Sequence, residues 1–229
     1  MLFMIIERFK SGRAPDMCRR FRDEAPLREW VANGEDLVDF AVIRENVGRR
    51  GGGHRAPVVS VQIRPYRLDD AAMVVEAAIE SIAAVQPWMP WCHPNYSFAE
   101  SRSWIAMQVE AFERRTAFEF AIVATDGRYL GGCGLNQIDA VNRRANLGYW
   151  VRSTAARRGV ATTAVRQLRD WAFEATDLVR LEIVIAAGNA ASHRVAEKSG
   201  AIREGVLRRR LILHDVAHDA TIFSFTRVG

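Results

Sequence analysis

Apolar residues follow two spacings along most of this chain, and the two spacings alternate. Apolar residues at every second position, or in a short continuous run, predict strands, whereas apolar residues three and four positions apart predict helices. The expected strands are residues 58–66, 118–125, 129–138, 145–152, 181–186, 202–213 and 220–227. The expected helices are residues 69–84, 98–114, 163–175 and 189–198.

The order of these elements predicts the fold class. It reads β-α-α-β-β-β-α-β-α-β-β, and several strands follow one another without a helix between them. Directly connected strands form hairpins, so most neighbours in the sheet should run antiparallel. Asp126-Gly127 is a typical hairpin turn between two of them. The sequence therefore predicts an α/β (α+β) fold with a mixed, mostly antiparallel central sheet flanked by helices, and not a doubly wound sheet.

A change in composition separates the first part of the chain from the rest. Residues 49–57 read Arg-Arg-Gly-Gly-Gly-His-Arg-Ala-Pro, which is typical of a linker. Residues 1–48 hold too little apolar material to bury a core alone. They could pack on the main domain, pair with a second copy of the chain as a homodimer, or stay partly disordered. We therefore expect an N-terminal extension, residues 1–57, with no assigned function, and a main domain, residues 58–229.

Charge narrows the classes of partner only slightly. The 229 residues carry a formal net charge of +5, and the pI is about 9.5. Such an excess suits a phosphorylated cofactor, an acidic substrate or nucleic acid. Acidic residues are interspersed throughout residues 1–57, so we do not expect this segment to be a nucleic-acid-binding arm.

Cysteine usage and hydropathy point to the cytoplasm. Cys18, Cys92 and Cys133 are an odd number and lack the spacing of a zinc site, which favours a reducing compartment. No apolar run approaches the roughly 20 residues that cross a bilayer, so no membrane partner is expected. Residues 1–6 lack the basic lead and the cleavage pattern of a secretion signal.

The strongest candidate for chemistry lies between a predicted strand and a predicted helix. Residues 157–162 read Arg-Arg-Gly-Val-Ala-Thr. The first N–H groups of a helix have no partner inside the helix, and the helix dipole places partial positive charge there. Gly159 allows close approach of the backbone, and Arg157 and Arg158 add full charges. This pattern predicts a site for the phosphate or pyrophosphate of a nucleotide-like cofactor.

The same loop carries a resemblance to a known family. It matches the pyrophosphate-loop pattern Gln/Arg-x-x-Gly-x-Gly/Ala of the GNAT superfamily of acyl-CoA-dependent N-acyltransferases, except that Ala156 stands at the first position. Three further segments resemble this family, or within it the ribosomal-protein N-terminal (RimJ/RimL-like) acetyltransferases. They are residues 148–152, residues 189–192 with 197–201, and residues 87–91 with the chain end around 204–207 and 218–220.

The resemblance implies where acetyl-CoA (coenzyme A) would bind. In the family it lies in an opening between the fourth and fifth strands, here residues 149–152 and 182–186. Asn189 would reach the pantetheine arm, with capping of the following helix as the alternative or additional role. The implied cofactor contacts are Tyr149, Trp150, Val151, Arg152, Arg157, Arg158, Gly159, Val160, Ala161, Thr162, Asn189 and Ser192.

The resemblance also implies a catalytic residue, Ser192. Acetylation of an amine expels a thiolate, and a hydroxyl near the sulfur can donate a proton as charge develops there. Many family members use a tyrosine one turn later, where this chain has Ala196. In the branch that this chain resembles, a serine at the position of Ser192 is proposed to act instead. A serine that only caps the helix is the alternative.

A general base is not visible in the sequence. Many family members carry glutamate on the fourth strand, where this chain has Asn146. Glu119, Asp139, Glu182 or a chain of waters could serve. The amine could also arrive neutral, because an α-amino group has a pKa near 8.

Two further groups of residues have spacings that suggest a site. Trp88, Met89 and Trp91 are expected to wall the acceptor site, with core packing under a loop as the alternative. His214 and His218 have the spacing of a metal-binding pair on a helix, but their segment is expected to be a turn, so no metal site is predicted.

The predicted function is transfer of an acetyl group from acetyl-CoA directly to a primary amine, which makes the chain an acyltransferase. The acceptor would be a protein N-terminus, such as that of a ribosomal protein, or a small-molecule amine. The alternative is a non-catalytic CoA-binding or protein-interaction module on the same fold, since Asn146 and Ala196 depart from the pattern of many active members.

Overall fold

The computed structural model describes residues 60–227, and the expectations for residues 1–57 lie outside this range. Its strands are β1 (Val61–Pro65), β2 (Phe118–Ala124), β3 (Tyr129–Asp139), β4 (Arg144–Val151), β5 (Arg180–Ala186), β6 (Ile202–Leu213) and β7 (Val216–Thr226). Its helices are α2 (Ala71–Val85), α3 (Phe98–Glu113), α4 (Val160–Ala175) and α5 (Ala190–Ser199), with short 3-10 turns η1 (Leu68–Asp70) and η2 (Ser153–Ala155).

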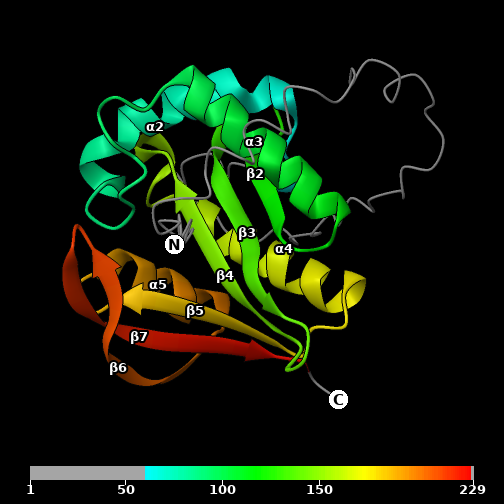
Figure 1. The fold of residues 1–229 in the computed structure, drawn as a ribbon, viewed down its shortest axis with the longest axis vertical. Coiled ribbons are helices and arrows are strands. Elements are labelled where there is room, and N and C mark those ends of the chain that lie inside the picture. The colour runs from blue at the N-terminus through cyan, green and yellow to red at the C-terminus, as the bar shows by residue number, and fades with distance from the viewer. Residues whose placement is uncertain (1–59, 228–229) are drawn as a thin grey trace, which may run out of the picture. The chain divides into compact units, whose positions relative to one another are not determined.

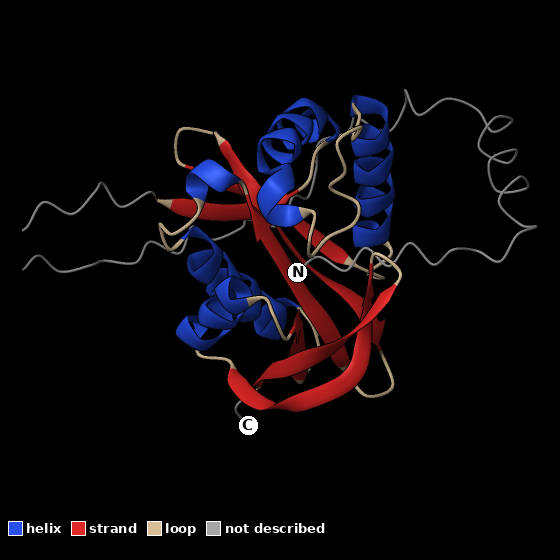
Figure 2. Cartoon of the chain, turned by 90° about the vertical axis from the view of Figure 1, so that its left-hand side faces the viewer, coloured by secondary structure: helices blue, strands red, loops and turns tan. Residues whose placement is uncertain are grey.

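The strands form one sheet in the order β1-β2-β3-β4-β5-β7-β6. Within residues 60–227, β4 and β5 are the one parallel pair, and every other neighbouring pair is antiparallel. The predicted mixed, mostly antiparallel sheet is confirmed. Helices α4 and α5 lie on one face of the sheet, and α2 and α3 lie on the other side, as Figures 1 and 2 show.

Two hydrophobic clusters hold these layers together. Under α4 and α5, alternate strand residues such as Leu147, Ile183 and Phe223 are fully buried against helix residues such as Leu168. On the other face, α2 and α3 bury Val74 and other side chains against β2, β3 and β4. Burial of this kind is the main favourable contribution to folding, at about 25 cal/mol per Å² of apolar surface. Both strand faces at the centre of the sheet are therefore covered, which explains the nearly continuous apolar runs in β2 and β4.

Two boundaries differ from those expected. Helix α4 begins at Val160 and not at residue 163, and Gly159 is its N-cap, with a left-handed backbone and no side-chain cap. Strand β7 begins at Val216 and not at residue 220. The turn before it is only His214 and Asp215, which both have positive φ values of 48° and 63°. Both residues of a type I′ hairpin turn have such values.

The lengths and apolar content of the described helices can be compared with those of a membrane-spanning helix. Among the described residues, no helix is both long enough and apolar enough to cross a bilayer.

Candidate functional site

The pairing between β4 and β5 stops partway along both strands. The last paired residues are Asn146 and Glu182, although β4 continues to Val151 and β5 to Ala186. Figure 1 shows the two ribbons starting side by side and diverging toward their carboxyl ends. Main-chain groups that face this divergence are not used by the opposite strand. They can hydrogen-bond an extended, amide-containing chain placed between the strands.

The loop that was expected to bind a phosphate lies directly before helix α4, which follows β4. Gly159 is the N-cap of α4, with φ of 79°, and no side chain caps the helix. Space above Gly159 is open, since a Cβ built there would have no atom within 4 Å. Arg157 also has a positive φ, 61°. Arg158 between them does not have a positive φ, so the backbone handedness alternates, and successive N–H groups in such a segment can converge on an anion.

The first turn of α4 contributes through its backbone. Val160 and Ala161 are buried, so their side chains pack into the core while the N–H groups of the first turn point out of the helix end. These groups and the helix dipole favour a negative group at this position. Val160, Ala161 and Thr162 were expected in the loop, and the structure corrects this: they form the first helical turn.

Arg152 holds the loop and does not point to a ligand. Its guanidinium donates to Glu76, to Glu80 and to the main-chain oxygen of Tyr129. Glu80 also accepts from the N–H and the hydroxyl of Thr154, both at 2.9 Å. Any contact of Arg152 with a cofactor would therefore be made by its main chain. This pairing fixes η2 against α2 and so fixes the approach to the anion site.

The Arg152 contacts predict a pH-dependent loss of stability in Glu80→Gln. The hydrogen bond from Arg152 lowers the pKa of Glu80 to about 2. A lowered carboxyl pKa stabilises the fold above pH 4.5, and this contribution is lost as pH falls from 4.5 toward 2. Because the side chain is 25% exposed, we expect Glu80→Gln to cost only about 1 kcal/mol at pH 7. Urea unfolding at pH 7 and pH 3 checks this, and an equal loss at both values contradicts it.

A recess beside the anion site adds one arginine, Arg128, to Arg158. It is lined by Arg128, Leu130, Thr154, Ala155, Arg158 and Val160. Arg128 comes from the turn between β2 and β3, and the sequence reasoning did not include it. Its position beside Arg158 depends on the pairing of strands that are distant in sequence, so no local signal could have indicated it.

Helix α5 begins beside the divergence of β4 and β5. The side-chain oxygen of Asn189 accepts the N–H of Ser192 at 3.1 Å, so Asn189 caps α5 and Ser192 does not. The Ser192 hydroxyl lies instead 2.8 Å from the hydroxyl of Tyr149, which is also 3.0 Å from the main-chain oxygen of Ser192. Burial raises the pKa of Tyr149, so this hydroxyl keeps its proton near neutral pH. The hydroxyl pair can therefore donate a proton or a hydrogen bond.

The three residues that were expected to wall the acceptor site, Trp88, Met89 and Trp91, have different surroundings. Met89 is only 5% exposed and packs in the cluster under α2, where it supports the loop from below. The ring of Trp91 packs edge-on against Trp150 of β4, with 5.3 Å between centroids. The ring of Trp88 lies against Gly188, where a built Cβ would be 3.5 Å away. The tryptophan loop thus meets the chain just before Asn189.

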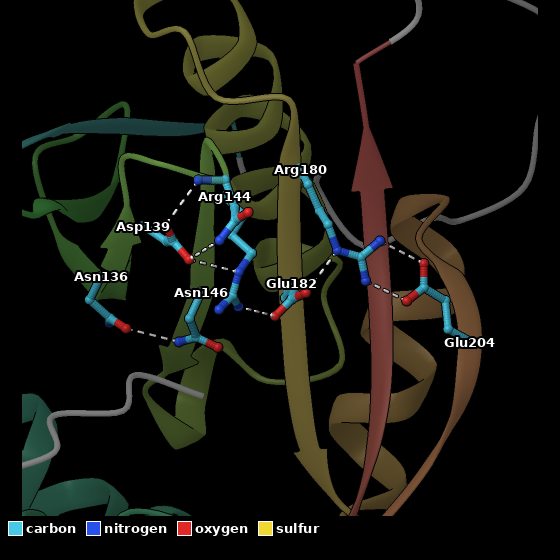
Figure 3. A network of polar contacts seen from close by, with 8 residues as sticks. Asn136, Asp139, Arg144, Asn146, Arg180, Glu182 and Glu204 are labelled. Atoms are coloured by element: carbon cyan, nitrogen blue, oxygen red, sulfur yellow. Dashed lines mark hydrogen bonds and ion pairs between the residues drawn. The ribbon is translucent and has the colours of Figure 1, made fainter.

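The three carboxylates considered as a base have different surroundings. Asp139 is bonded to Asn142 and pairs with Arg144, and Glu182 pairs with Arg144 and Arg180. Figure 3 shows these ion pairs across β4 and β5. Glu119 of β2 is 4% exposed, and among the described residues its Oε2 has no hydrogen-bond partner.

Comparison with known proteins places this geometry among acetyltransferases. Residues 60–202, more than half of the chain, match the family model described as the acetyltransferase (GNAT) domain. The ribosomal N-acetyltransferase named YdaF, from Bacillus subtilis (strain 168), is 36% identical over 44% of this chain and 56% of its own length. That match spans about half of YdaF. YjcK of the same organism, named as an N-acetyltransferase, is 30% identical over 72% of this chain and 93% of its own length.

A solved structure supports the same comparison. RimJ of Mycobacterium smegmatis, in complex with a CoA-disulfide, is 26% identical and has a TM-score of 0.68. The match covers 75% of this chain and 84% of RimJ.

Proposed function

The chain belongs to the GNAT acetyltransferase family, and from that premise we propose that it acetylates the α-amino group of a protein N-terminus, with a ribosomal protein as the first candidate. Acetyl transfer from acetyl-CoA is the chemistry of this family. The observation that carries the proposal is the uncapped start of α4 beside the point where β4 and β5 part. The relative named as a ribosomal N-acetyltransferase supports the choice of acceptor.

The residues present fit acetyl-CoA. The N–H groups at the start of α4 suit its diphosphate, and Arg128 and Arg158 line the adjoining recess. The separated ends of β4 and β5 offer main-chain partners to its amide-containing arm. Residues 60–227 offer the amide NH₂ of Asn189 no acceptor, so this group remains able to donate to the same arm. When bound, acetyl-CoA supplies an acetyl group activated as a thioester.

The protein's own part in the reaction lies where α5 begins. Ser192 is 7% exposed and hydrogen-bonded to Tyr149, so it is oriented by a buried partner. The one proton of the Tyr149 hydroxyl has two acceptors within reach, the main-chain oxygen of Ser192 and Oγ. When Tyr149 donates to Oγ, the Ser192 proton is free to be given to a leaving thiolate. The buried surroundings also exclude water, which strengthens such a hydrogen bond.

These observations support catalysis over a non-catalytic module. A hydroxyl pair at the start of α5 supplies a proton donor even though Ala196 stands where many family members have tyrosine. A module that only bound CoA would have no use for an oriented Ser192 hydroxyl. Homodimer formation and a cytoplasmic location remain predictions of the sequence.

The proposal is tested with acetyl-CoA and a panel of amines. We expect free thiol to be released with peptides that have an unblocked N-terminus. We expect none with the same peptides blocked at the N-terminus but carrying lysine. Release only with small amines such as polyamines would contradict the proposed acceptor, and binding of acetyl-CoA without release would favour the non-catalytic module.

Ser192→Ala is expected to lower kcat by about 10- to 100-fold and to leave the Kd for acetyl-CoA nearly unchanged. The reason is that the hydroxyl acts on charge that develops only during reaction. Ser199→Ala is the matched control, because Ser199 is also buried in α5 but its hydroxyl bonds only to the main-chain oxygen of Ala196, at 2.7 Å. Steady-state kinetics and calorimetric titration measure both constants. An unchanged kcat in Ser192→Ala would remove Ser192 from the reaction.

A further inference from the structure

We infer that Glu119 is the general base of this enzyme and takes the proton from the attacking amine. The inference rests on the proposed function and adds the residue that the sequence did not reveal. It is carried by the position of one buried carboxylate on the sheet face where β4 and β5 separate.

Glu119 extends over β3 toward β4 because Gly134, which lies opposite it, has no side chain. It pairs with Gly134 of β3, and Gly134 pairs with Gly148 of β4, so the three positions lie in one row on one face of the sheet. The carboxylate lies over Gly134, where a built Cβ would be only 1.9 Å from Oε2. The row continues to Gly148, two residues beyond the last β4–β5 pair at Asn146. Glu119 thus points along the sheet toward the strand ends that would hold the thioester arm.

The neighbouring row orients this carboxylate. Asn136 donates to Oε1 of Glu119 at 3.4 Å, and Asn146 donates to the side-chain oxygen of Asn136 at 2.9 Å. Figure 3 shows the Asn136–Asn146 contact next to the Arg144–Glu182 pair. The chain of amides fixes one carboxylate oxygen, while Oε2 has no partner among the described residues. A buried acceptor without a partner is costly, and an amine N–H would satisfy it.

Asn146 has a role in this arrangement. It stands where many family members carry glutamate, and its amide now connects β4 to the carboxylate on β2 through Asn136. The acidic group is present on the same sheet face, two strands away. The departure at Asn146 is therefore a displacement of the carboxylate and not its loss.

The protonation equilibrium of Glu119 suits this role. Burial raises its pKa to about 8, and the hydrogen bond from Asn136 acts in the opposite direction. At pH 7 the ionised minority of Glu119 accepts the proton, and because an α-amino group also has a pKa near 8, transfer from the ammonium to that carboxylate costs little. The titratable groups that feel its charge are Tyr66 and Cys133, whose pKa values burial raises. In the next row Glu182 is neutralised by Arg144.

In the proposed step the substrate nitrogen loses two protons, one to Glu119 and one to Ser192. The substrate ammonium gives one proton to Glu119, and the freed nitrogen lone pair forms the C–N bond to the acetyl carbon. The C–S bond breaks, and its electron pair leaves on sulfur. Ser192 gives its proton to the sulfur and is reprotonated with the second proton that the nitrogen loses. The products are the acetylated amine, the free thiol of CoA and one proton, which Glu119 returns to solvent.

Glu119→Gln keeps the size and the hydrogen bond to Asn136 but cannot accept a proton. We expect kcat/KM for an unblocked peptide to fall about 100-fold at pH 7 and less than about 10-fold at pH 9.5, where the amine is already neutral. A purely structural role would give the same loss at both pH values and would overturn the inference. Glu110→Gln, which changes a partly exposed carboxylate on α3, is the control and should retain activity at both pH values.

A second measurement does not depend on activity. The folded state holds an extra proton on Glu119 between pH 4.5 and about 8, so its burial costs more stability as pH rises through this range. Glu119→Gln removes that cost. Its Tm relative to the unchanged protein should therefore increase by several degrees between pH 5 and pH 9. A Tm difference that is constant with pH would overturn the buried acidic carboxyl on which the inference depends.

The outcomes separate this inference from the proposed function. If the unchanged protein acetylates only small amines, the proposed acceptor fails, and the same pH comparison is made with the amine that reacts. If Glu119→Gln does not fold, Glu119→Asp takes its place, because the shorter side chain keeps the carboxylate but withdraws it from its position over Gly134. Full activity of Glu119→Asp or of Glu119→Gln at pH 7 excludes Glu119 as the base.

Discussion

Gly159→Asp should weaken binding of acetyl-CoA by at least about 100-fold, which corresponds to about 2.7 kcal/mol. Aspartate is among the best N-cap residues, so its carboxylate would accept the N–H groups at the start of α4 that Gly159 leaves free. It would also place a negative charge where the diphosphate docks. Space does not prevent this, since a Cβ at Gly159 meets no atom within 4 Å. Isothermal titration with acetyl-CoA measures the loss.

Two control variants separate charge from backbone strain. Gly159→Asn has nearly the same shape as aspartate, tolerates a left-handed φ and carries no charge. Gly159→Ala carries only the strain of the φ of 79°. We expect both to bind acetyl-CoA more tightly than Gly159→Asp. If all three bind as tightly as the unchanged protein, the anion site is not at the start of α4.

Gly131→Ala should destabilise the fold by at least about 4 kcal/mol and lower Tm by at least about 8 °C. A Cβ at Gly131 would lie 2.2 Å from the main-chain oxygen of Trp150 and 2.7 Å from Cα of Val151. Backbone atoms of a central strand cannot move aside as a side-chain end can. Moreover, Gly131 has φ of 152° and pairs with Val151, so the clash falls on the part of β4 that would hold the cofactor. Thermal unfolding followed by circular dichroism measures the change.

Other glycines test whether the clash is the cause. Gly127 has a positive φ of 84° but no atom within 4 Å of its Cβ position, so Gly127→Ala should cost only about 1 kcal/mol. Gly205 has neither a positive φ nor a close neighbour, so Gly205→Ala should be nearly neutral. A Tm loss for Gly131→Ala no larger than that for Gly127→Ala would show that strands β3 and β4 have room to separate.

Most of the fold could be predicted because its signals are local. Periodicity marked every strand and helix of residues 60–227, and the order of elements indicated the mostly antiparallel sheet. The errors fell at ends where conformation is set by backbone geometry. His214-Asp215 has no Asn-Gly signature, yet both residues adopt positive φ, and β7 therefore starts four residues early.

The candidate site was only partly predictable, because only some of its contacts join residues that are close in the sequence. The Gly159 loop and the capping Asn189 are recognisable because each acts on groups within a few residues of itself. The role of Tyr149 beside Ser192 was missed, because those residues meet across 43 positions of sequence. The sequence left open whether Met89 packs in the core or faces an acceptor, because a burial pattern does not tell which side of a loop faces the core.

The sequence alone determined the elements and the mostly antiparallel character of the sheet, and it indicated the loop that we propose to hold a diphosphate, since helix ends, turns and apolar periodicity depend on neighbouring residues. Tertiary structure alone decided where β4 and β5 part, which buried carboxylate has one oxygen without a hydrogen-bond partner among residues 60–227, and which arginine pairs with Glu80. These features depend on strand register, because register brings Glu119, Gly134 and Gly148 into one row. Register is set by the packing of the whole sheet and not by any segment of the chain.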